Sequence, residues 1–259
     1  MIVIPMAGLS RRFADAGYRV PKYMLSAHGQ SIFSHAVRSF AAYFDTVPFL
    51  FVVRDIADTP KFVDKECRRL GLANFQVVVL RETTRGQAET VEHGLAHAPV
   101  SADAPVTIFN IDTIRPNFSL MSFTGRSDGY LEVFRGTGAN WSYVRPAASG
   151  SDVVAETAEK HAISNLCCTG IYHFASARLF HTAYAEYLTN FDHSSRLKEL
   201  YVAPLYNVLI SLGQVIRYTI IDQSEVIFCG VPDEYENFKR NGELLPWDGT
   251  NANGGQPLR

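Results

Sequence analysis

The sequence predicts an α/β fold in three layers, with helices on both faces of a mixed, mostly parallel sheet. Short, mainly apolar runs occur at residues 1–6, 48–53, 75–80 and 106–111, as in parallel strands that are buried on both faces. The segments between these runs carry apolar residues at helical spacing, which indicates crossover helices. A chain of 259 residues, 47% of them hydrophobic, is long and apolar enough to bury one large core.

Three helices are expected in the first half, each between two of the apolar runs. They cover residues 31–44, 59–70 and 86–96, and each carries one apolar stripe. The stripes consist of Ile32, Phe33, Ala36, Val37, Phe40 and Ala41, then Phe62, Val63, Cys67 and Leu70, then Ala88, Val91 and Leu95. Strands joined by such crossover helices run parallel to one another.

After residue 112 the predicted strands become shorter, and Gly and Ser are more frequent between them. The expected elements are strands at 129–134, 140–144, 153–156 and 170–174, helices at 175–187 and 195–212, strands at 214–221 and 225–228, and a last helix from Pro232. Proline is favoured in the first turn of a helix. We expect these strands to extend the parallel core as a mixed sheet. Residues 246–259, rich in Gly, Asn and Pro, are expected to form a disordered or peripheral tail.

Charge and cysteine content argue against several classes of protein. Lys and Arg total 24 against 26 Asp and Glu, so the net charge of −2 gives no global attraction to nucleic acid or anionic membrane. The four cysteines lack C-x-x-C spacing, and we expect reduced, buried thiols. The first apolar run ends after Met6, which is too short for a signal peptide or a membrane span. We expect a cytoplasmic protein that binds neither nucleic acid nor membrane.

A small, basic loop follows the first apolar run. Ala7, Gly8 and Ser10 allow backbone N–H groups to approach an anion, and Arg12 and Lys22 bring positive charge. In an open α/β sheet, ligands bind beyond the carboxyl ends of the strands, where this loop is expected to lie. The loop contains neither G-x-G-x-x-G nor G-K-[ST]. It predicts a phosphate site, with an ordinary solvated turn as the alternative.

This segment resembles the signature of the sugar-phosphate nucleotidylyltransferases, G-G-x-G-T-R-(L/F) followed by Pro-Lys. Arg12 and Lys22 keep the ten-residue spacing of that signature, while Ser10 replaces its second glycine. Similar stretches continue to about residue 240: Thr84-Arg85-Gly86, Asn110-Ile111-Asp112, Trp141-Ser142, Glu159-Lys160, Thr169-Gly170-Ile171-Tyr172 and Gly230-Val231-Pro232. The chain is most similar to the bacterial branch related to glucose-1-phosphate thymidylyltransferases, which is associated with capsule and surface-polysaccharide precursors.

The resemblance implies a Rossmann-like fold of the nucleotide-diphospho-sugar transferase type. It implies one domain, residues 1–245, in which 1–112 bind the nucleotide and 113–245 bind the acceptor. It also implies a Mg²⁺-dependent nucleotidyltransferase, a pyrophosphorylase of the EC 2.7.7 type. Such an enzyme moves a nucleoside monophosphate from an NTP to a phosphorylated small molecule, here first of all a sugar 1-phosphate, and releases pyrophosphate. Positioning and charge neutralisation are then the main requirements.

Two basic residues are the expected catalytic groups. The resemblance assigns Lys22 to the α-phosphate, and the forked donors of Arg12 suit the β- and γ-phosphates. The loop residues expected to contact the nucleotide are Ala7, Gly8, Leu9 and Ser10.

Asp112 is the expected Mg²⁺ ligand. It ends the fourth apolar run, where a carboxylate is unfavourable unless it is solvated, paired or bound to a metal. A cap for the turn at Thr113 is the alternative. The family's second metal carboxylate falls at Phe228, a departure for which Glu225 is the expected substitute. Because Mg²⁺ often uses only one or two carboxylates, Asp112 with phosphates and water is the other option.

The resemblance places the nucleobase beside Gly86. Arg81 stands where thymidylyltransferases have a glutamine. Arginine only donates hydrogen bonds, which suits O2 and N3 of cytosine better than the N3–H of thymine or uracil. Arg81 or Arg85 at the base edge, with Glu89 accepting from the amino group, therefore favours CTP, with UTP and dTTP as alternatives. Solvated arginines are the competing explanation.

The acceptor is expected at Glu159, Lys160, Gly170 and Tyr172, by the same resemblance. Lys160 would bind the acceptor phosphate, and Glu159 a hydroxyl or amine. A surface ion pair between Glu159 and Lys160 is an equally weighted alternative.

Two other functions remain open from the sequence. A glycosyltransferase that uses a nucleotide sugar would share the α/β layout, although its usual D-x-D motif is absent at Asp112-Thr113-Ile114. A catalytically silent nucleotide-binding regulatory protein is consistent with Ser10 and Phe228. The sequence determines neither the acceptor nor the oligomeric state, for which a homo-oligomer is one option.

Overall fold

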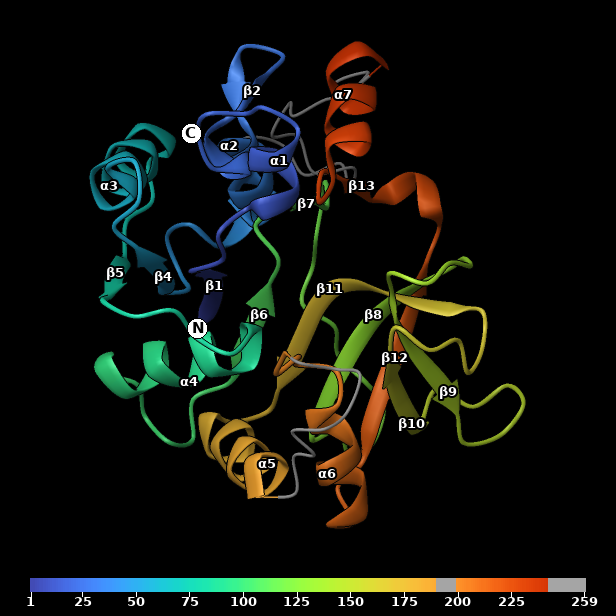
Figure 1. Ribbon diagram of the computed structural model, residues 1–259. Helices are drawn as coiled ribbons and strands as arrows, with labels where there is room; N and C mark the ends of the chain where they lie inside the picture. The colour runs from blue at the N-terminus through green and yellow to red at the C-terminus, as the bar shows by residue number, and fades with distance from the viewer. Residues whose placement is uncertain (190–198, 242–259) are drawn as a thin grey trace, which may run out of the picture.

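A computed structural model describes residues 1–189 and 199–241, and these residues form one mixed sheet of nine strands (Figure 1). Its parallel core consists of β1 (Ile2–Met6), β4 (Phe49–Arg54), β5 (Phe75–Leu80) and β6 (Val106–Phe109). β1 lies between β6 and β4, and β5 is at one edge. The parallel core predicted from the apolar runs is confirmed.

Five strands extend this core as a mixed sheet, as expected. β11 (Leu166–Phe174) runs antiparallel to β6, and β8 (Gly129–Arg135) runs antiparallel to β11. β12 (Ile216–Ile221) is parallel to β8. β9 (Ser142–Pro146) and β10 (Val154–Glu159) form an antiparallel pair beside β11.

Helices cover both faces of the sheet, which confirms the three-layer α/β fold. α2 (Ile32–Arg38) and α3 (Thr59–Leu70) pack on the face that carries Ile2 and Ile4 of β1. α4 (Gln87–His97), α5 (Ala177–Thr189) and α6 (Leu205–Ser211) pack on the face that carries Val3. Figure 1 shows the two groups of helices on opposite sides of the sheet. Neighbouring residues of β1 thus enter different cores, as the pleat of a strand requires.

A smaller assembly follows the carboxyl ends of β1 and β6. It contains α1 (Arg11–Asp15), the 3₁₀ helix η1 (Lys22–Met24), the hairpin β2 (Ser26–Ala27) and β3 (Gln30–Ser31), the antiparallel ribbon β7 (Thr113–Ile114) and β13 (Ile227–Phe228), and α7 (Pro232–Asn241). Phe13, Ile114, Tyr235 and Phe238 form its own apolar cluster. Figure 1 shows this assembly at the end of the sheet where the chain leaves β1 and enters the basic loop.

Several predicted boundaries differ from the structure. The helix predicted over 31–44 ends at Arg38, because the backbone at Phe40 leaves the helical region and continues as the 3₁₀ helix η2 (Ala41–Tyr43). The strand predicted from Gly170 already begins at Leu166. The strand predicted over 225–228 is shorter, because Asp222 caps the 3₁₀ helix η3 (Gln223–Glu225).

The helix predicted over 195–212 is only partly tested. Residues 199–204 are not helical, and α6 begins at Leu205. Residues 195–198 and the predicted tail, 246–259, lie outside the described residues. The division into nucleotide and acceptor halves remains a prediction.

All four cysteines are buried and unpaired, as expected. Among the described residues, no helix combines the length and the apolarity needed to cross a membrane.

Candidate active site

The loop after β1 turns sharply at Ser10. Ser10 has φ 49° and ψ 36°, in the left-handed region where a glycine is unstrained. Its carbonyl accepts hydrogen bonds from the N–H groups of Phe13 at 2.9 Å and Ala14 at 3.1 Å, which start α1. Its hydroxyl oxygen accepts a hydrogen bond from the Lys22 N–H at 3.4 Å. Ser10 therefore ties this loop to Lys22.

Gly8, Leu9 and Arg12 are exposed around this turn, whereas Ala7 is buried. The side chain of Leu9, which is 41% exposed, places an apolar surface next to the exposed Gly8. A ligand that combines a ring with anionic groups suits such a surface.

Lys22 and Asp112 form an ion pair next to this loop. The Lys22 ammonium donates to Oδ2 of Asp112, which follows β6. The two side chains are 23% and 20% exposed, so a ligand from solvent can reach the pair. The Cys229 N–H donates to the Asp112 carbonyl at 2.8 Å, which brings β13 to the site. A Cβ atom at Gly230 would stand 3.0 Å from Asp112 Oδ2, so glycine keeps space open beside this carboxylate.

The loop after β5 is held in place by the backbone of Leu200. The Leu200 N–H donates to the Arg85 carbonyl at 3.0 Å, and the Ala88 N–H donates to the Leu200 carbonyl at 2.9 Å. Gly86 has φ 157°, and a Cβ atom there would lie 2.5 Å from the backbone N and O of Leu200. Only glycine permits this close approach.

Glu89, in the first turn of α4, binds Arg85 with both carboxylate oxygens. Oε1 accepts from Arg85 Nε at 2.7 Å and Nη2 at 2.5 Å, and Oε2 accepts from the Arg85 backbone N–H at 2.5 Å. Burial acts to raise the pKa of Glu89, but the hydrogen bonds from Arg85 outweigh it and the net pKa is lowered. Glu89 thus orients Arg85, while Arg81 is exposed.

A second polar cluster lies between β9, β10 and β11. The Ser142 hydroxyl donates to Glu159 Oε2 and lies 3.3 Å from the Tyr172 hydroxyl. Burial raises the pKa of Glu159, against the opposing effects of the Ser142 hydrogen bond and the Lys160 charge. Burial also raises the pKa of Tyr172, and the charge of Asp112 adds to this effect. Ser142 thus links side chains of β10 and β11 at this cluster.

Gly170 connects this cluster to the end of β6. The Asn110 N–H donates to the Gly170 carbonyl at 3.2 Å, and a Cβ atom at Gly170, where φ is 101°, would lie 2.6 Å from Asn110 Nδ2. The Gln87 amide donates to Asn110 Oδ1. The side chain of Gln87 in α4 and the backbone of Gly170 in β11 thus meet at Asn110.

Lys160 directly follows Glu159, with φ 55°. Its ammonium donates to the Tyr201 hydroxyl, so the ion pair considered between Lys160 and Glu159 is not the contact that this lysine makes. Its N–H donates to the Trp141 carbonyl at 2.9 Å.

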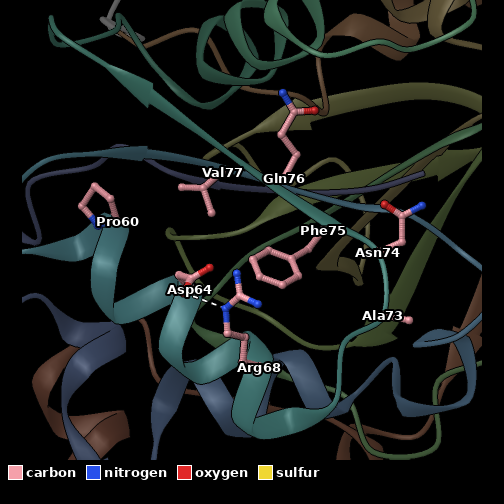
Figure 2. Close-up of a pocket in the computed structure, with 8 residues that line it drawn as sticks. All are labelled: Pro60, Asp64, Arg68, Ala73, Asn74, Phe75, Gln76 and Val77. Carbon is pink, nitrogen blue, oxygen red and sulfur yellow. Dashed lines mark hydrogen bonds and ion pairs between the residues drawn. The ribbon is translucent and has the colours of Figure 1, made fainter.

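A separate surface pocket of about 540 Å³ lies beside the edge strand β5 (Figure 2). It is lined by Pro60, Asp64, Arg68, Ala73, Asn74, Phe75, Gln76 and Val77. Arg68 Nε and Asp64 Oδ2 are 2.9 Å apart and neutralise each other. This pocket lacks the basic loop and the converging polar groups described above, so we place the candidate active site at the carboxyl ends of β1 and β6.

Comparison with known proteins identifies the family. No protein-family model matches the chain, and no curated protein does. A solved structure of the nucleoside-diphosphate-sugar pyrophosphorylase from Vibrio cholerae RC9 is 53% identical, covers 93% of this chain and 100% of its own, and superposes with a TM-score of 0.89. The chain belongs to the sugar-phosphate nucleotidylyltransferase family.

More distant structures share the fold of this nucleotidylyltransferase. The inositol-1-phosphate CTP transferase of T. maritima has a TM-score of 0.67 at 14% identity and covers 90% of this chain and 89% of its own. A UDP-glucose pyrophosphorylase in complex with UDP-glucose has a TM-score of 0.67 at 15% identity and covers 90% and 94%.

The family implies a metal, and Asp112 fits one as a single oxygen donor. Its carboxylate is partly exposed, and Gly230 leaves space beside it that any other side chain would reduce. Among the residues described, no three His, Cys, Asp or Glu side chains form a metal-binding group. Any Mg²⁺ here would therefore take its other ligands from phosphate oxygens and water, as this ion commonly does.

Glu225, the expected second carboxylate of the nucleotidylyltransferase, contacts other groups. Its Oε2 lies 3.3 Å from Nη2 of the buried Arg115, and its Oε1 accepts from the Asp222 N–H at 3.0 Å. The structure brings Lys22 to Asp112 but does not bring Glu225 to this pair. Phe228 packs on Trp141, with ring centroids 4.6 Å apart.

Several residues of the site were not identified from the sequence. Ser142 was noted only within a similar stretch, and Gln87 and Tyr201 were not noted at all. Tyr201 meets a lysine 41 residues away, and no local pattern in the sequence signals such a contact. Glu234, whose Oε2 accepts from the Gly230 N–H at 2.8 Å beside Asp112, was also missed.

Proposed function

We propose that this nucleotidylyltransferase transfers a nucleoside monophosphate from an NTP to a sugar 1-phosphate and releases pyrophosphate. The observation that carries the proposal is the Lys22–Asp112 pair, which is partly exposed beside the loop at Ser10 and tied to that loop by the Lys22 N–H. The 53% identical relative, described as a nucleoside-diphosphate-sugar pyrophosphorylase, supports the same reaction class.

In the proposed reaction, an oxygen of the acceptor phosphate attacks the α-phosphorus of the NTP. The bond from the α-phosphorus to the α,β-bridging oxygen breaks, and its electron pair leaves with pyrophosphate. Lys22 would stabilise charge on the α-phosphate, and Arg12 would hold the β- and γ-phosphates. Ala7, Gly8, Leu9 and Ser10 would line the nucleotide. The protein supplies alignment and positive charge and needs no covalent intermediate.

Asp112 is the proposed Mg²⁺ ligand in this nucleotidylyltransferase. When bound there, Mg²⁺ would add positive charge at the transferred and leaving phosphates. Asp112 would hold the cation through a carboxylate oxygen, and the Lys22 ammonium beside it would contact the phosphates.

CTP is the nucleotide that the base loop favours in our proposal. Arg85 is oriented by Glu89, and Arg81, four residues earlier in the chain, is exposed, so this segment presents donors. Donors match O2 and N3 of cytosine. Because both oxygens of Glu89 serve Arg85, we assign Glu89 to orienting this arginine rather than to accepting from the base. Gly86 would lie beside the base.

The acceptor side of the proposal uses the cluster at Ser142. Glu159, oriented by Ser142, would accept a hydrogen bond from a sugar hydroxyl, with Tyr172 and Gly170 beside it. Lys160 would bind the acceptor phosphate. Residues 1–112 would then serve the nucleotide and 113–245 the acceptor, in a cytoplasmic enzyme that supplies precursors for capsule or surface polysaccharide.

A pyrophosphate-release assay with CTP, UTP, dTTP, GTP and ATP against a panel of sugar 1-phosphates tests the function. We expect release with Mg²⁺, fastest with CTP. Replacing Lys22 by Ala should lower kcat about 100-fold or more, with a much smaller effect on nucleotide binding. Lys61→Ala, which removes an 84% exposed lysine, is the matched control.

Other outcomes of the same assay would overturn parts of the proposal. A clear preference for dTTP would remove the assignment of CTP. Nucleotide binding without release, over the whole panel, would favour the silent regulatory protein. Hydrolysis or transfer of sugar from a nucleotide sugar would favour a glycosyltransferase.

A further inference from the structure

The hydroxyl of Tyr201 lies between two charged side chains. It accepts a hydrogen bond from the Lys160 ammonium and is hydrogen-bonded in turn to the carboxylate of Glu199. Lys160 Nζ is also 4.5 Å from the Tyr201 ring centroid, within the range of a cation–π contact. A polar chain from Lys160 through Tyr201 to Glu199 therefore fixes the lysine head group.

The backbone of Lys160 is also in an unusual conformation. A left-handed φ of 55° in a lysine costs about 1 kcal/mol or more. The hydrogen bond from its N–H to the Trp141 carbonyl, 2.9 Å, maintains this conformation. Strain of this kind persists only where the surroundings hold it, and it is concentrated at binding sites.

Tyr201 is held from the nucleotide side as well. Its neighbour Leu200 is hydrogen-bonded to the backbone of Arg85, in the loop that we assign to the nucleobase, and of Ala88, in the first turn of α4. Burial and Glu199 raise the pKa of Tyr201, whereas the charge of Arg12 lowers it. Tyr201 thus connects the nucleotide side of the site to Lys160.

We propose that Tyr201 is a positioning residue that presents the Lys160 ammonium to the phosphate of the acceptor, a phosphomonoester dianion. The inference rests on the proposed function, because that function assigns the acceptor phosphate to Lys160. An ammonium has three donors, so one bond to Tyr201 leaves two for phosphate oxygens. A lysine held in advance loses less side-chain freedom when the acceptor binds.

Four variants test this role: Tyr201→Phe, Lys160→Ala, the double variant, and Tyr218→Phe as the matched control. The Tyr218 hydroxyl donates to the Ser151 carbonyl at 2.8 Å, so the control also loses one tyrosine hydrogen bond. Tyr201→Phe should raise the KM of the acceptor about tenfold, the equivalent of one hydrogen bond to a charged group. The KM of the NTP should change less than about twofold.

The double variant distinguishes positioning from general damage. If Tyr201 acts through Lys160, its replacement should have no further effect on acceptor KM once Lys160 is Ala. The inference is overturned if Tyr201→Phe leaves the KM of the acceptor unchanged. It is also overturned if Tyr201→Phe raises this KM equally in the presence of Lys160 and in the Lys160→Ala background.

A binding measurement separates this inference from the proposed function. Titration of glucose 1-phosphate and of inorganic phosphate, followed by ³¹P NMR without nucleotide, should show weaker binding in Tyr201→Phe and in Lys160→Ala than in Tyr218→Phe. If binding weakens in this way but no variant and no unaltered protein releases pyrophosphate, the positioning role of Tyr201 is supported and the proposed nucleotidyl transfer is rejected. If turnover is normal and Tyr201→Phe leaves the binding of both probes unchanged, the positioning role of Tyr201 is rejected and the proposed nucleotidyl transfer is retained. Absence of binding of both probes to the unaltered protein would also overturn the inference.

Discussion

Ser10 illustrates a departure from the family pattern at the scale of one residue. A serine in the left-handed region costs about 1 kcal/mol, where a glycine would cost little. In return, its hydroxyl oxygen accepts the Lys22 N–H at 3.4 Å, a contact that glycine could not make. The substitution therefore exchanges local strain for a tether on the proposed catalytic lysine.

Asp112 provides a prediction at the same scale. Replacing Asp112 by Asn should strengthen the binding of NTP in EDTA, because Lys22 loses its competing carboxylate and its charge becomes available to phosphate. The same change should lower kcat with Mg²⁺ about 100-fold or more, because the proposed metal ligand is lost. Calorimetric titration in EDTA and steady-state rates in Mg²⁺ measure the two effects.

The two measurements on Asp112→Asn have opposite signs, which makes the prediction specific. Weaker binding in EDTA would show that Asp112 does not compete for Lys22. Asp103→Asn is a suitable control, because Asp103 forms an exposed ion pair with Arg178 away from the site.

At the scale of elements, Glu66 joins α3 to the start of α2. Its Oε2 accepts from the hydroxyls of Ser31 and Ser34 and from Arg69 Nη2 at 2.9 Å. Burial opposes the charge of Glu66, yet the hydrogen bonds from Arg69, Ser34 and Ser31 lower its pKa from 4.5 to about 2. Ionised Glu66 therefore stabilises the folded state above about pH 4.5, and this contribution is lost as pH falls toward 2.

We predict that Glu66→Gln lowers the free energy of unfolding by about 2 kcal/mol at pH 7. The difference from the unaltered protein should shrink at pH 3.5, because protonation of Glu66 removes the same contribution. Urea unfolding at pH 7, 5 and 3.5 measures it, with the exposed Glu82→Gln as control. A difference that stays constant with pH would contradict the assignment.

The contact between the base loop and Leu200 provides a second prediction about elements. Gly86→Ala would place a Cβ atom 2.5 Å from the Leu200 backbone and should cost about 3 kcal/mol or more in stability. Gly71→Ala is the matched control, because Gly71 has φ 76° with nothing within 4 Å of an added Cβ, and should cost only about 1 kcal/mol. Equal losses in urea unfolding would show that crowding at Leu200 is unimportant.

The elements that the sequence predicted well have strong local signals. Residues 75–80 are apolar except for Gln76, and α3 combines Pro60 near its start with Gly71 in the left-handed region after its end. The helix predicted to residue 44 ends at Arg38, because the backbone leaves the helical region at Phe40, and the Ser39 hydroxyl there accepts a hydrogen bond from the Arg115 N–H at 2.9 Å. Propensity alone does not contain that contact.

The candidate site was predictable to the extent that the resemblance marked it. Lys22 and Asp112 are 90 residues apart in sequence and meet as an ion pair, and the order of the parallel strands explains why. Tyr201 could not be found, because its place depends on Leu200 packing against a distant loop. Glu225 was assigned by distance in sequence, and the buried Arg115 attracts it instead.

At the scale of the whole molecule, the four thiols report on the integrity of the fold. All four cysteines are buried, and each belongs to a different apolar cluster: Cys67, Cys167, Cys168 and Cys229. Burial raises the pKa of each thiol, which further slows its reaction.

We predict that a disulfide reagent such as DTNB labels less than one thiol per chain within minutes under native conditions and four in urea. Absorbance at the wavelength of the released thiolate counts the modified groups. Labelling of Cys229 should slow further with nucleotide and Mg²⁺, because its N–H is bonded to Asp112. Rapid native labelling would mean that at least one cluster opens readily.

The ion pair between Lys22 and Asp112 has a consequence for selectivity in a cell. Small anions such as chloride or orthophosphate are abundant, and a bare lysine in a loop shaped for phosphate would collect them. The Asp112 carboxylate disfavours the binding of such anions to Lys22. Each anion would have to break the ion pair, and it would bring no cation to compensate Asp112. In the proposed reaction, a nucleotide bound with Mg²⁺ would offer phosphates to Lys22 and a cation to Asp112, so the pair would favour this substrate over a free anion.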